Sequence, residues 1–172
     1  MAKKDAEKSA KALSEALLNP RKNGFFAVSD EKIEKADKFC EGYKAFLDSA
    51  KTERESVEYA VKAAEKHGFV PFDPAHEYAP GDKVYYNNRG KALCLAVIGK
   101  EGCKNGVRIA AAHIDNPRLD LKPIPLYESS ELAYLKTHYY GGIKKYQWTA
   151  IPLAMHGVIV KRDGTSVAVR IG

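Results

Sequence analysis

Cysteine is scarce in this sequence, and its three residues, Cys40, Cys94 and Cys103, are widely spaced. No two of them form the Cys-x-x-Cys spacing of a redox or zinc motif. An odd and scattered count does not make the disulfide framework on which small secreted domains rely. We therefore expect reduced thiols and a cytoplasmic protein.

Long apolar runs are also lacking. No window approaches the roughly 18 apolar residues that a membrane-spanning helix needs. The first residues, from Met1 to Asp5, have no apolar core behind them, so the chain does not begin like a secretory signal. The sequence predicts neither export nor a membrane partner.

A stripe of one charge sign is missing as well. The formal net charge is +6, but the lysines are spread along acid-rich segments such as residues 31–66. That pattern is typical of a solvated helix face. The pair Lys144 and Lys145 is too short for a nucleic-acid stripe, so we do not expect a nucleic-acid partner.

With 172 residues, 45% of them hydrophobic and 29% charged, the chain can form one ordinary domain, or one domain and part of another. Amphipathic patterns predict helices over residues 2–18 and 31–50, the second opened by Ser29 or Asp30. A third helix begins near residue 51, with Thr52 as its cap and Glu55 as the capping-box partner. His67 and Gly68 end it.

Extended segments follow these helices. Residues 83–98 predict a hairpin with a turn at 87–90, and its apolar second half predicts a central strand. Residues 107–112 are small and β-branched, as in a strand covered on both faces. Residues 119–121 alternate like a strand, and residues 151–171 predict a further hairpin around 161–164. The expected fold class is α/β.

A histidine and an acid stand at the end of the strand expected over residues 107–112. His113 is followed by Asp115, and Asn116-Pro117 ends the strand. A neutral imidazole is a good zinc ligand, and its second ring nitrogen usually donates to a carboxylate. The alternative is a core histidine beside a turn aspartate. The tripeptide alone favours that alternative, because ligating histidines are a minority.

Longer motifs favour a metal-binding role for His113 over a core histidine. The string AAAHIDNPRLDLKP resembles the first metal-binding segment of dinuclear zinc aminopeptidases of the aspartyl aminopeptidase and vacuolar aminopeptidase I family. Further matches to this family lie in the same order along the chain: FLDSAKTERESVEYAVKAAEKHGF (46–69), GDKVYYNNRGKALCLAVIG (81–99) and HYYGGIKKYQW (138–148). The resemblance covers residues 10–172, and the YGGIKKYQW form is similar to the bacterial branch.

The resemblance implies an N-terminal portion of a metal-dependent aminopeptidase, which removes the N-terminal residue of peptides. Residues 1–136 would belong to a mixed-sheet catalytic domain, and residues 137–172 would start a β-rich domain that mediates oligomerisation. The complete enzyme would bind two zinc ions and form a homo-oligomer. His113 would be a metal ligand, and Asp115 would be the catalytic carboxylate that holds its ring.

Most of such a site has no counterpart in the sequence. No Glu-Glu pair follows residue 113, and the remaining downstream histidines, His138 and His156, lie in the part that resembles the second domain. We therefore expect the 172-residue chain by itself to be inactive. A non-catalytic assembly or binding module that retains the fold is the main alternative, and another metal-dependent hydrolase is a third. His138 could reach a substrate or a neighbouring subunit, or simply pack in a loop.

Overall fold

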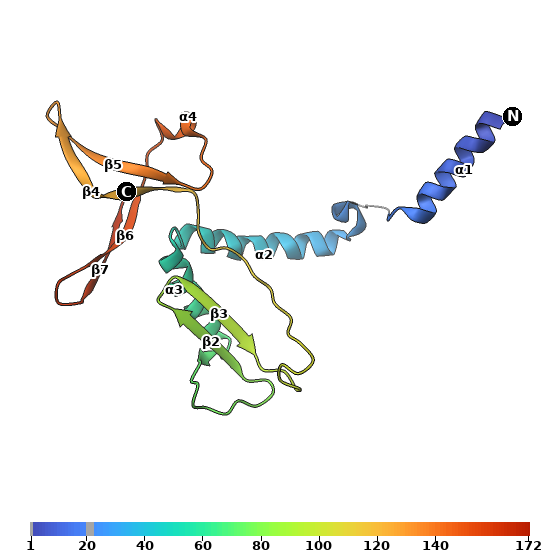
Figure 1. Cartoon of the computed structure of the whole chain (residues 1–172), viewed down its shortest axis with the longest axis horizontal. Coiled ribbons are helices and arrows are strands. Elements are labelled where there is room, and N and C mark those ends of the chain that lie inside the picture. The colour runs from blue at the N-terminus through green and yellow to red at the C-terminus, as the bar shows by residue number, and fades with distance from the viewer. Residues whose placement is uncertain (1, 20–22) are drawn as a thin grey trace. The chain divides into compact units, whose positions relative to one another are not determined.

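The computed structural model describes residues 2–19 and 23–172, and it divides into two compact units, Met1–Tyr43 and Lys44–Gly172 (Figure 1). The elements in chain order are α1 (Ala2–Leu17), the 3-10 helix η1 (Gly24–Ala27), α2 (Asp30–Ser49), α3 (Glu53–Lys66), β1 (Val70–Pro71), β2 (Lys83–Asn88), β3 (Ala92–Val97), β4 (Arg118–Ser129), β5 (Leu132–Tyr140), α4 (Lys145–Trp148), β6 (Met155–Val160) and β7 (Ser166–Ile171). The predicted α/β class is confirmed.

The N-terminal unit contains α1, η1 and most of α2. Local hydrogen bonds define where its helices begin: the Asn23 side chain accepts from the backbone N–H of Phe25 at 3.0 Å, and the Ser29 carbonyl accepts from Lys32 and Ile33. These contacts agree with the helix start predicted at Ser29 and Asp30. No helix in the described part of the chain is both long and apolar enough to cross a membrane.

The core of the second unit lies between α3 and the sheet formed by β1, β2 and β3. Val57 and Ala64 on α3 are buried, as are Val84 and Tyr85 on β2. The Tyr85 hydroxyl donates to Glu65 on α3 at 2.8 Å, so this tyrosine keeps a hydrogen-bond partner while its ring fills the core. The helix and the hairpin that packs against it are thereby joined by apolar packing and by polar contacts, which include a bond from Lys83 Nζ to the His67 carbonyl at 3.0 Å.

Both ends of α3 are capped as its sequence predicts. The Thr52 hydroxyl accepts from the backbone N–H of Glu55 at 3.3 Å, and the Glu55 carboxylate accepts from the backbone N–H of Lys51 at 3.0 Å. The first contact satisfies an amide that a helix start leaves without a partner, and the second holds the residue that precedes the cap. At the other end, Gly68 has a φ of +82°, the left-handed conformation that glycine adopts without strain.

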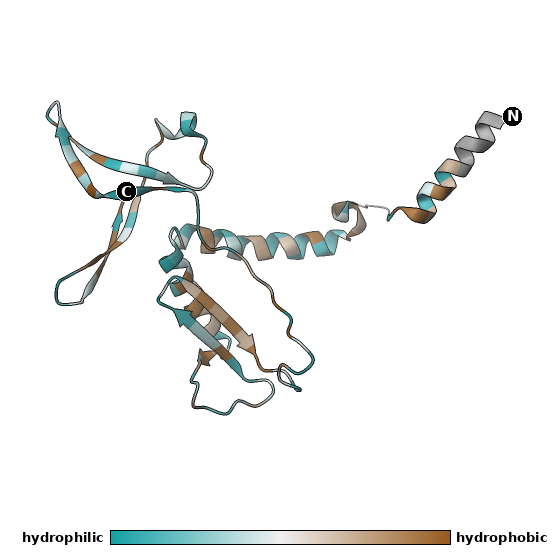
Figure 2. Cartoon of the chain, in the orientation of Figure 1, coloured by the Kyte–Doolittle hydropathy of each residue, from teal (hydrophilic) through white to brown (hydrophobic). Residues whose placement is uncertain are grey.

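The first sheet is mixed, with β1 parallel to β2 and β2 antiparallel to β3. The predicted hairpin is confirmed, and Arg89 and Gly90 in its turn have positive φ. The expectation that residues 92–98 form a central strand is wrong for the described chain. There β3 pairs with β2 alone, and Figure 2 shows its hydrophobic residues in brown, with Leu95 and Val97 exposed.

Two further hairpins form separate sheets, β4 with β5 and β6 with β7. The β6–β7 hairpin agrees with the prediction. The β4–β5 hairpin is longer than residues 119–121 suggested, and its register shifts between Leu121 and Leu126, where Pro123 and Pro125 cannot donate to the ladder. Its tight turn places Ser130 and Glu131 at φ +56° and +63°.

The strand predicted over residues 107–112 is not formed. In Figure 1 this segment runs as an unpaired connection from the end of β3 to the start of β4. Ile109 is 81% exposed. An apolar run of this kind becomes a strand only where neighbouring strands satisfy its backbone groups, and no strand among the described residues pairs with it. His113 therefore follows an extended segment rather than a sheet strand.

Candidate functional site

His113 projects from this extended segment, with its side chain 82% exposed. Its Nδ1 lies 3.0 Å from the backbone carbonyl oxygen of Asp115 and 3.3 Å from the carboxylate oxygen Oδ1 of the same residue. Nδ1 can donate to these oxygens only when it carries the ring proton. The contact therefore selects the tautomer whose lone pair is on Nε2.

The other carboxylate oxygen of Asp115 contacts a residue from β5. Oδ2 accepts a hydrogen bond from the Tyr140 hydroxyl at 2.5 Å. This bond is the main reason that the pKa of Asp115 lies below its ordinary value and that the pKa of Tyr140 lies above its own. The carboxylate thus faces an imidazole with one oxygen and a phenol with the other.

Arg118, the first residue of β4, lies directly opposite Tyr140 in the ladder. The centre of its guanidinium is 4.1 Å from the centroid of the Tyr140 ring. Its Nη1 is 2.9 Å from Glu53 at the start of α3, and its Nε donates to Asp120 at 2.7 Å. Two carboxylates therefore fix the cation that lies against the tyrosine.

The backbone after Tyr140 also approaches the segment that follows His113. Gly141 has a φ of +73°, and a Cβ added there would come within 3.5 Å of Pro117. Glycine tolerates both this positive φ and such a close backbone approach. The end of β5 and the segment that follows His113 are therefore neighbours through both side chains and backbone.

A second cluster lies two residues further along α3, around Glu55. The Glu55 carboxylate is 3.0 Å from Nδ1 of His156 on β6 and 3.0 Å from Nε of Arg170 on β7. Only 12% of the Glu55 side chain is exposed. The first turn of α3 thus contacts both C-terminal hairpins, the β4–β5 hairpin through Glu53 and the β6–β7 hairpin through Glu55.

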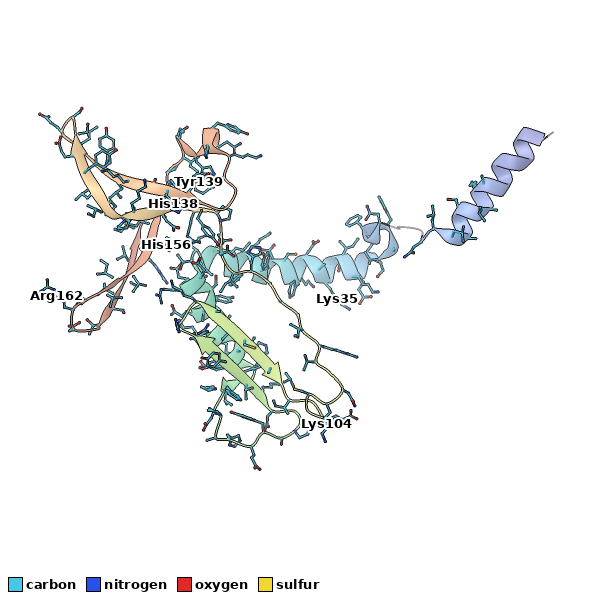
Figure 3. The ribbon with its side chains drawn as sticks, viewed as in Figure 1. Lys35, Lys104, His138, Tyr139, His156 and Arg162 are labelled. Atoms are coloured by element: carbon cyan, nitrogen blue, oxygen red, sulfur yellow. The ribbon has the colours of Figure 1, made fainter. Side chains whose placement is uncertain are left out.

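The two downstream histidines take different places. His138 is exposed on β5 opposite Asp120, so it does not pack in a loop (Figure 3). His156 is half-buried on β6 and has the structural contact with Glu55. Within residues 2–19 and 23–172, no three His, Cys, Asp or Glu side chains form a group that could hold a metal ion. His113 and Asp115 are a pair, not a complete zinc site.

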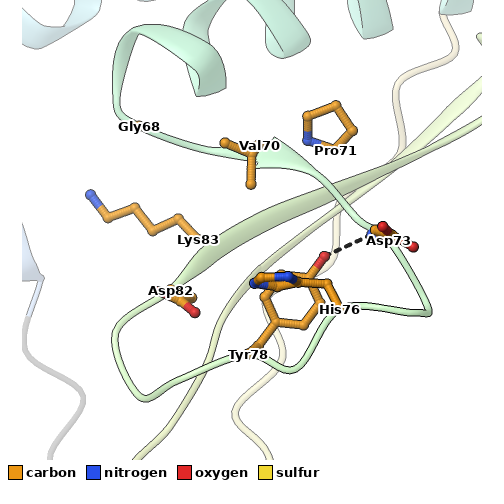
Figure 4. A pocket seen from close by; sticks show the side chains of 8 residues that line it. All are labelled: Gly68, Val70, Pro71, Asp73, His76, Tyr78, Asp82 and Lys83. Atoms are coloured by element: carbon orange, nitrogen blue, oxygen red, sulfur yellow. Dashed lines mark hydrogen bonds between the residues drawn. The ribbon is translucent and has the colours of Figure 1, made fainter.

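Two open hollows in the second unit lie away from this pair. One, of about 380 Å³, lies beside β1 and the start of β2, with Asp73, His76, Tyr78 and Lys83 in its lining (Figure 4). The dashed line there is the hydrogen bond that the Asp73 backbone N–H donates to the Tyr78 hydroxyl at 2.7 Å. The other, of about 330 Å³, lies between α3 and the β2–β3 turn. Neither includes His113.

Sequence reasoning identified His113 and Asp115 but missed Tyr140, Arg118 and Glu53. The tyrosine stands before a glycine pair, and that was the local signal available for it. Its contact with Asp115 depends on the β4–β5 register, which places Arg118 opposite Tyr140. Glu53 lies where the sequence predicts only a helix start near residue 51.

Comparison with known proteins assigns the chain to a family. The family model described as aminopeptidase I zinc metalloprotease (M18) matches residues 46–171. A probable M18 family aminopeptidase 1 of Clostridium acetobutylicum is 49% identical over 160 residues, which are 91% of this chain and 34% of that protein. Its counterpart in Borrelia garinii is 43% identical over 88% of this chain and 33% of its own length.

Solved structures agree. Aminopeptidase I from Borrelia burgdorferi B31 superposes with a TM-score of 0.81 at 41% identity, over 88% of this chain and 37% of that one. The M18 aminopeptidase of Thermotoga maritima gives 0.79 at 42% identity, over 90% and 33%. The chain spans about a third of the length of the curated relatives that it matches. It belongs to the M18 family of aminopeptidase I zinc metalloproteases.

Proposed function

We propose that this chain is part of an aminopeptidase that hydrolyses the N-terminal residue from peptides. Its family membership and the names of its relatives support that activity. We assign residues 1–136 to the catalytic domain and residues 137–172 to the start of a β-rich oligomerisation domain, a boundary that falls within β5. The complete enzyme is a cytoplasmic homo-oligomer on this proposal.

The observation that carries the proposal is the orientation of His113. Nδ1 faces Asp115, so Nε2 of the exposed ring is open to solvent and available to bind a metal ion. Metal-binding histidines commonly donate their other ring N–H to a carbonyl or a carboxylate, which fixes the tautomer and the direction of the ring. His113 would hold one of two zinc ions through Nε2, and Asp115 would orient it.

These two residues fit one corner of a zinc site. A catalytic zinc takes three protein ligands, and the described residues contain no group of that size. Zinc, when bound, supplies an acidified water and polarises the peptide carbonyl. This chain would contribute one imidazole nitrogen, Nε2 of His113, at a fixed position. We therefore propose that the 172-residue chain by itself has no appreciable peptidase activity.

A chimeric enzyme tests the activity. The corresponding third of the Clostridium acetobutylicum relative is replaced by the matching part of this chain, and hydrolysis of aminoacyl-naphthylamides is measured. We expect activity in the chimera and a loss of at least about 100-fold after His113→Ala, because a ligand matters at least as much as the residues that orient it. His76→Ala, in an exposed loop, is the matched control.

A non-catalytic assembly or binding module is the alternative, and the incomplete metal site favours it. It predicts an inactive chimera while the unmodified relative remains active. An active chimera that is insensitive to His113→Ala would leave the peptidase assignment but remove the role of His113.

A further inference from the structure

The carboxylate of Asp115 joins two rings that are far apart in the sequence. Oδ1 lies 3.3 Å from His113 Nδ1, and Oδ2 accepts from the hydroxyl of Tyr140, 25 residues later, at 2.5 Å. Asp115 itself lies in a segment without helix or strand. A hydrogen bond from a strand therefore restrains a carboxylate whose own backbone is not held in a sheet.

Tyr140 is itself held on more than one side. Arg118 lies opposite it in the ladder with its guanidinium 4.1 Å from the ring centroid. Glu53 and Asp120 fix that guanidinium at 2.9 and 2.7 Å. Contacts thus run without a break from the first residue of α3, through β4 and β5, to the segment that carries His113 and Asp115.

We infer that Tyr140 is a positioning residue for His113, acting through Asp115. Its hydroxyl fixes the Asp115 carboxylate. The backbone carbonyl of Asp115 at 3.0 Å and this carboxylate at 3.3 Å together keep the proton of the imidazole on Nδ1 and the lone pair on Nε2. The inference rests on the proposed function, in which Nε2 of His113 binds a metal. A tyrosine that only stabilised the hairpin would leave the tautomer of His113 unchanged.

The tautomer can be read directly from the ring nitrogens of His113 by ¹⁵N NMR on the metal-free chain. At about pH 8.5 an ordinary imidazole is neutral, so the two ring nitrogens report which of them carries the proton. We expect the Nδ1–H form to dominate in the wild type. Tyr140→Phe keeps the ring beside Arg118 and removes the hydroxyl. It should lower the ratio of Nδ1–H to Nε2–H about fivefold, the factor that one hydrogen bond of ordinary strength supplies.

Tyr139→Phe is the matched control, since it removes the hydroxyl of the neighbouring residue on β5 and leaves the ring that Lys145 contacts. It should leave the tautomer ratio unchanged. The inference is overturned if the wild type has Nε2–H, if Tyr140→Phe leaves the ratio unchanged, or if both variants change it equally.

Circular dichroism reports whether Tyr140→Phe retains its fold. If that variant unfolds, Arg118→Gln replaces it in the test. It must shift the ratio in the same direction, because it releases the Tyr140 ring, and an unchanged ratio overturns the inference.

Addition of Zn²⁺ is a separate measurement. A ratio that depends on Tyr140, together with ring nitrogens that do not respond to Zn²⁺, supports the positioning role and contradicts the proposed metal role.

Discussion

The carboxylate of Glu55 lies 3.0 Å from Nδ1 of His156, although 101 residues separate the two in the sequence. Glu55 also receives the backbone N–H of Lys51 and the guanidinium of Arg170. One side chain therefore caps α3 and attaches the β6–β7 hairpin to it. Its removal should weaken both local and long-range structure.

This cluster predicts a loss of stability in acid. Burial alone would raise the pKa of Glu55, but the bonds from His156 and Lys51 and the charge of Arg170 lower it overall from 4.5. A carboxyl with a lowered folded pKa stabilises the folded state above its unfolded value, and that stability is lost as pH falls through the folded value. The free energy of unfolding should thus decrease below about pH 4.5.

Urea denaturation of Glu55→Gln measures this contribution. The variant should be less stable at about pH 7 by about 1–2 kcal/mol, and its difference from the wild type should shrink towards about pH 3. Glu31→Gln removes the partner of Lys35 from a side chain that is 73% exposed, and its effect should stay below about 0.5 kcal/mol. Equal effects of both variants at all pH values would contradict this account.

The cap of α3 gives a second prediction. Thr52→Ala removes the hydroxyl that accepts from the backbone of Glu55 and should destabilise the chain by about 1 kcal/mol. Thr52→Ser keeps the hydroxyl and should retain most of the stability. Thermal unfolding of the three proteins distinguishes a capping role from simple packing of the threonine methyl group, for which serine would be as harmful as alanine.

The small core gives a third prediction. Val57 is 2% exposed between α3 and the sheet, so Val57→Ala should cost about 2 kcal/mol in the free energy of unfolding. Val97→Ala makes the same chemical change on β3 at a residue that is 59% exposed, and it should cost less than about 0.5 kcal/mol. Denaturant midpoints compare the two; a larger loss at Val97 would mean that the core lies elsewhere.

The β4–β5 turn gives a fourth prediction. Glu131 has a φ of +63°, a conformation that strains a residue with a Cβ. Glu131→Gly should therefore relieve this strain and stabilise the hairpin by up to about 1 kcal/mol. The larger conformational entropy that glycine gives to the unfolded chain reduces this gain. Ala133→Gly, in the adjoining strand, should destabilise it. Hydrogen exchange of the β5 amides follows this local change, and slower exchange in both variants would contradict the strain argument.

Local signals in the sequence predicted much of the fold. Thr52 with Glu55 predicted the start of α3, and the turn at 87–90 predicted the β2–β3 hairpin, because caps and tight turns depend on neighbours along the chain. The β4–β5 turn was missed because Ser130 and Glu131 stand where glycine or asparagine is usual. Residues 107–112 were predicted as a strand from their composition alone, and composition does not supply a partner strand.

The candidate site also combines a contact between near neighbours in the sequence with contacts between distant residues. His113 and Asp115 are two residues apart, so their contact could be anticipated from the sequence. Tyr140 contacts Asp115 from β5. Arg118 on β4 and Glu53 on α3 support that tyrosine through a strand register and an ion pair. No local pattern encodes those positions. The residues that support the histidine were therefore found only in three dimensions.

Nε2 of His113 is the metal ligand that we propose. Titration of Zn²⁺ into the ¹⁵N-labelled chain, with the ring nitrogens of its five histidines resolved, tests it most directly. We predict that Nε2 of His113 responds first and at the lowest Zn²⁺ concentration, while Nδ1 keeps its proton. A response at the other histidines that leaves His113 unchanged would contradict the claim.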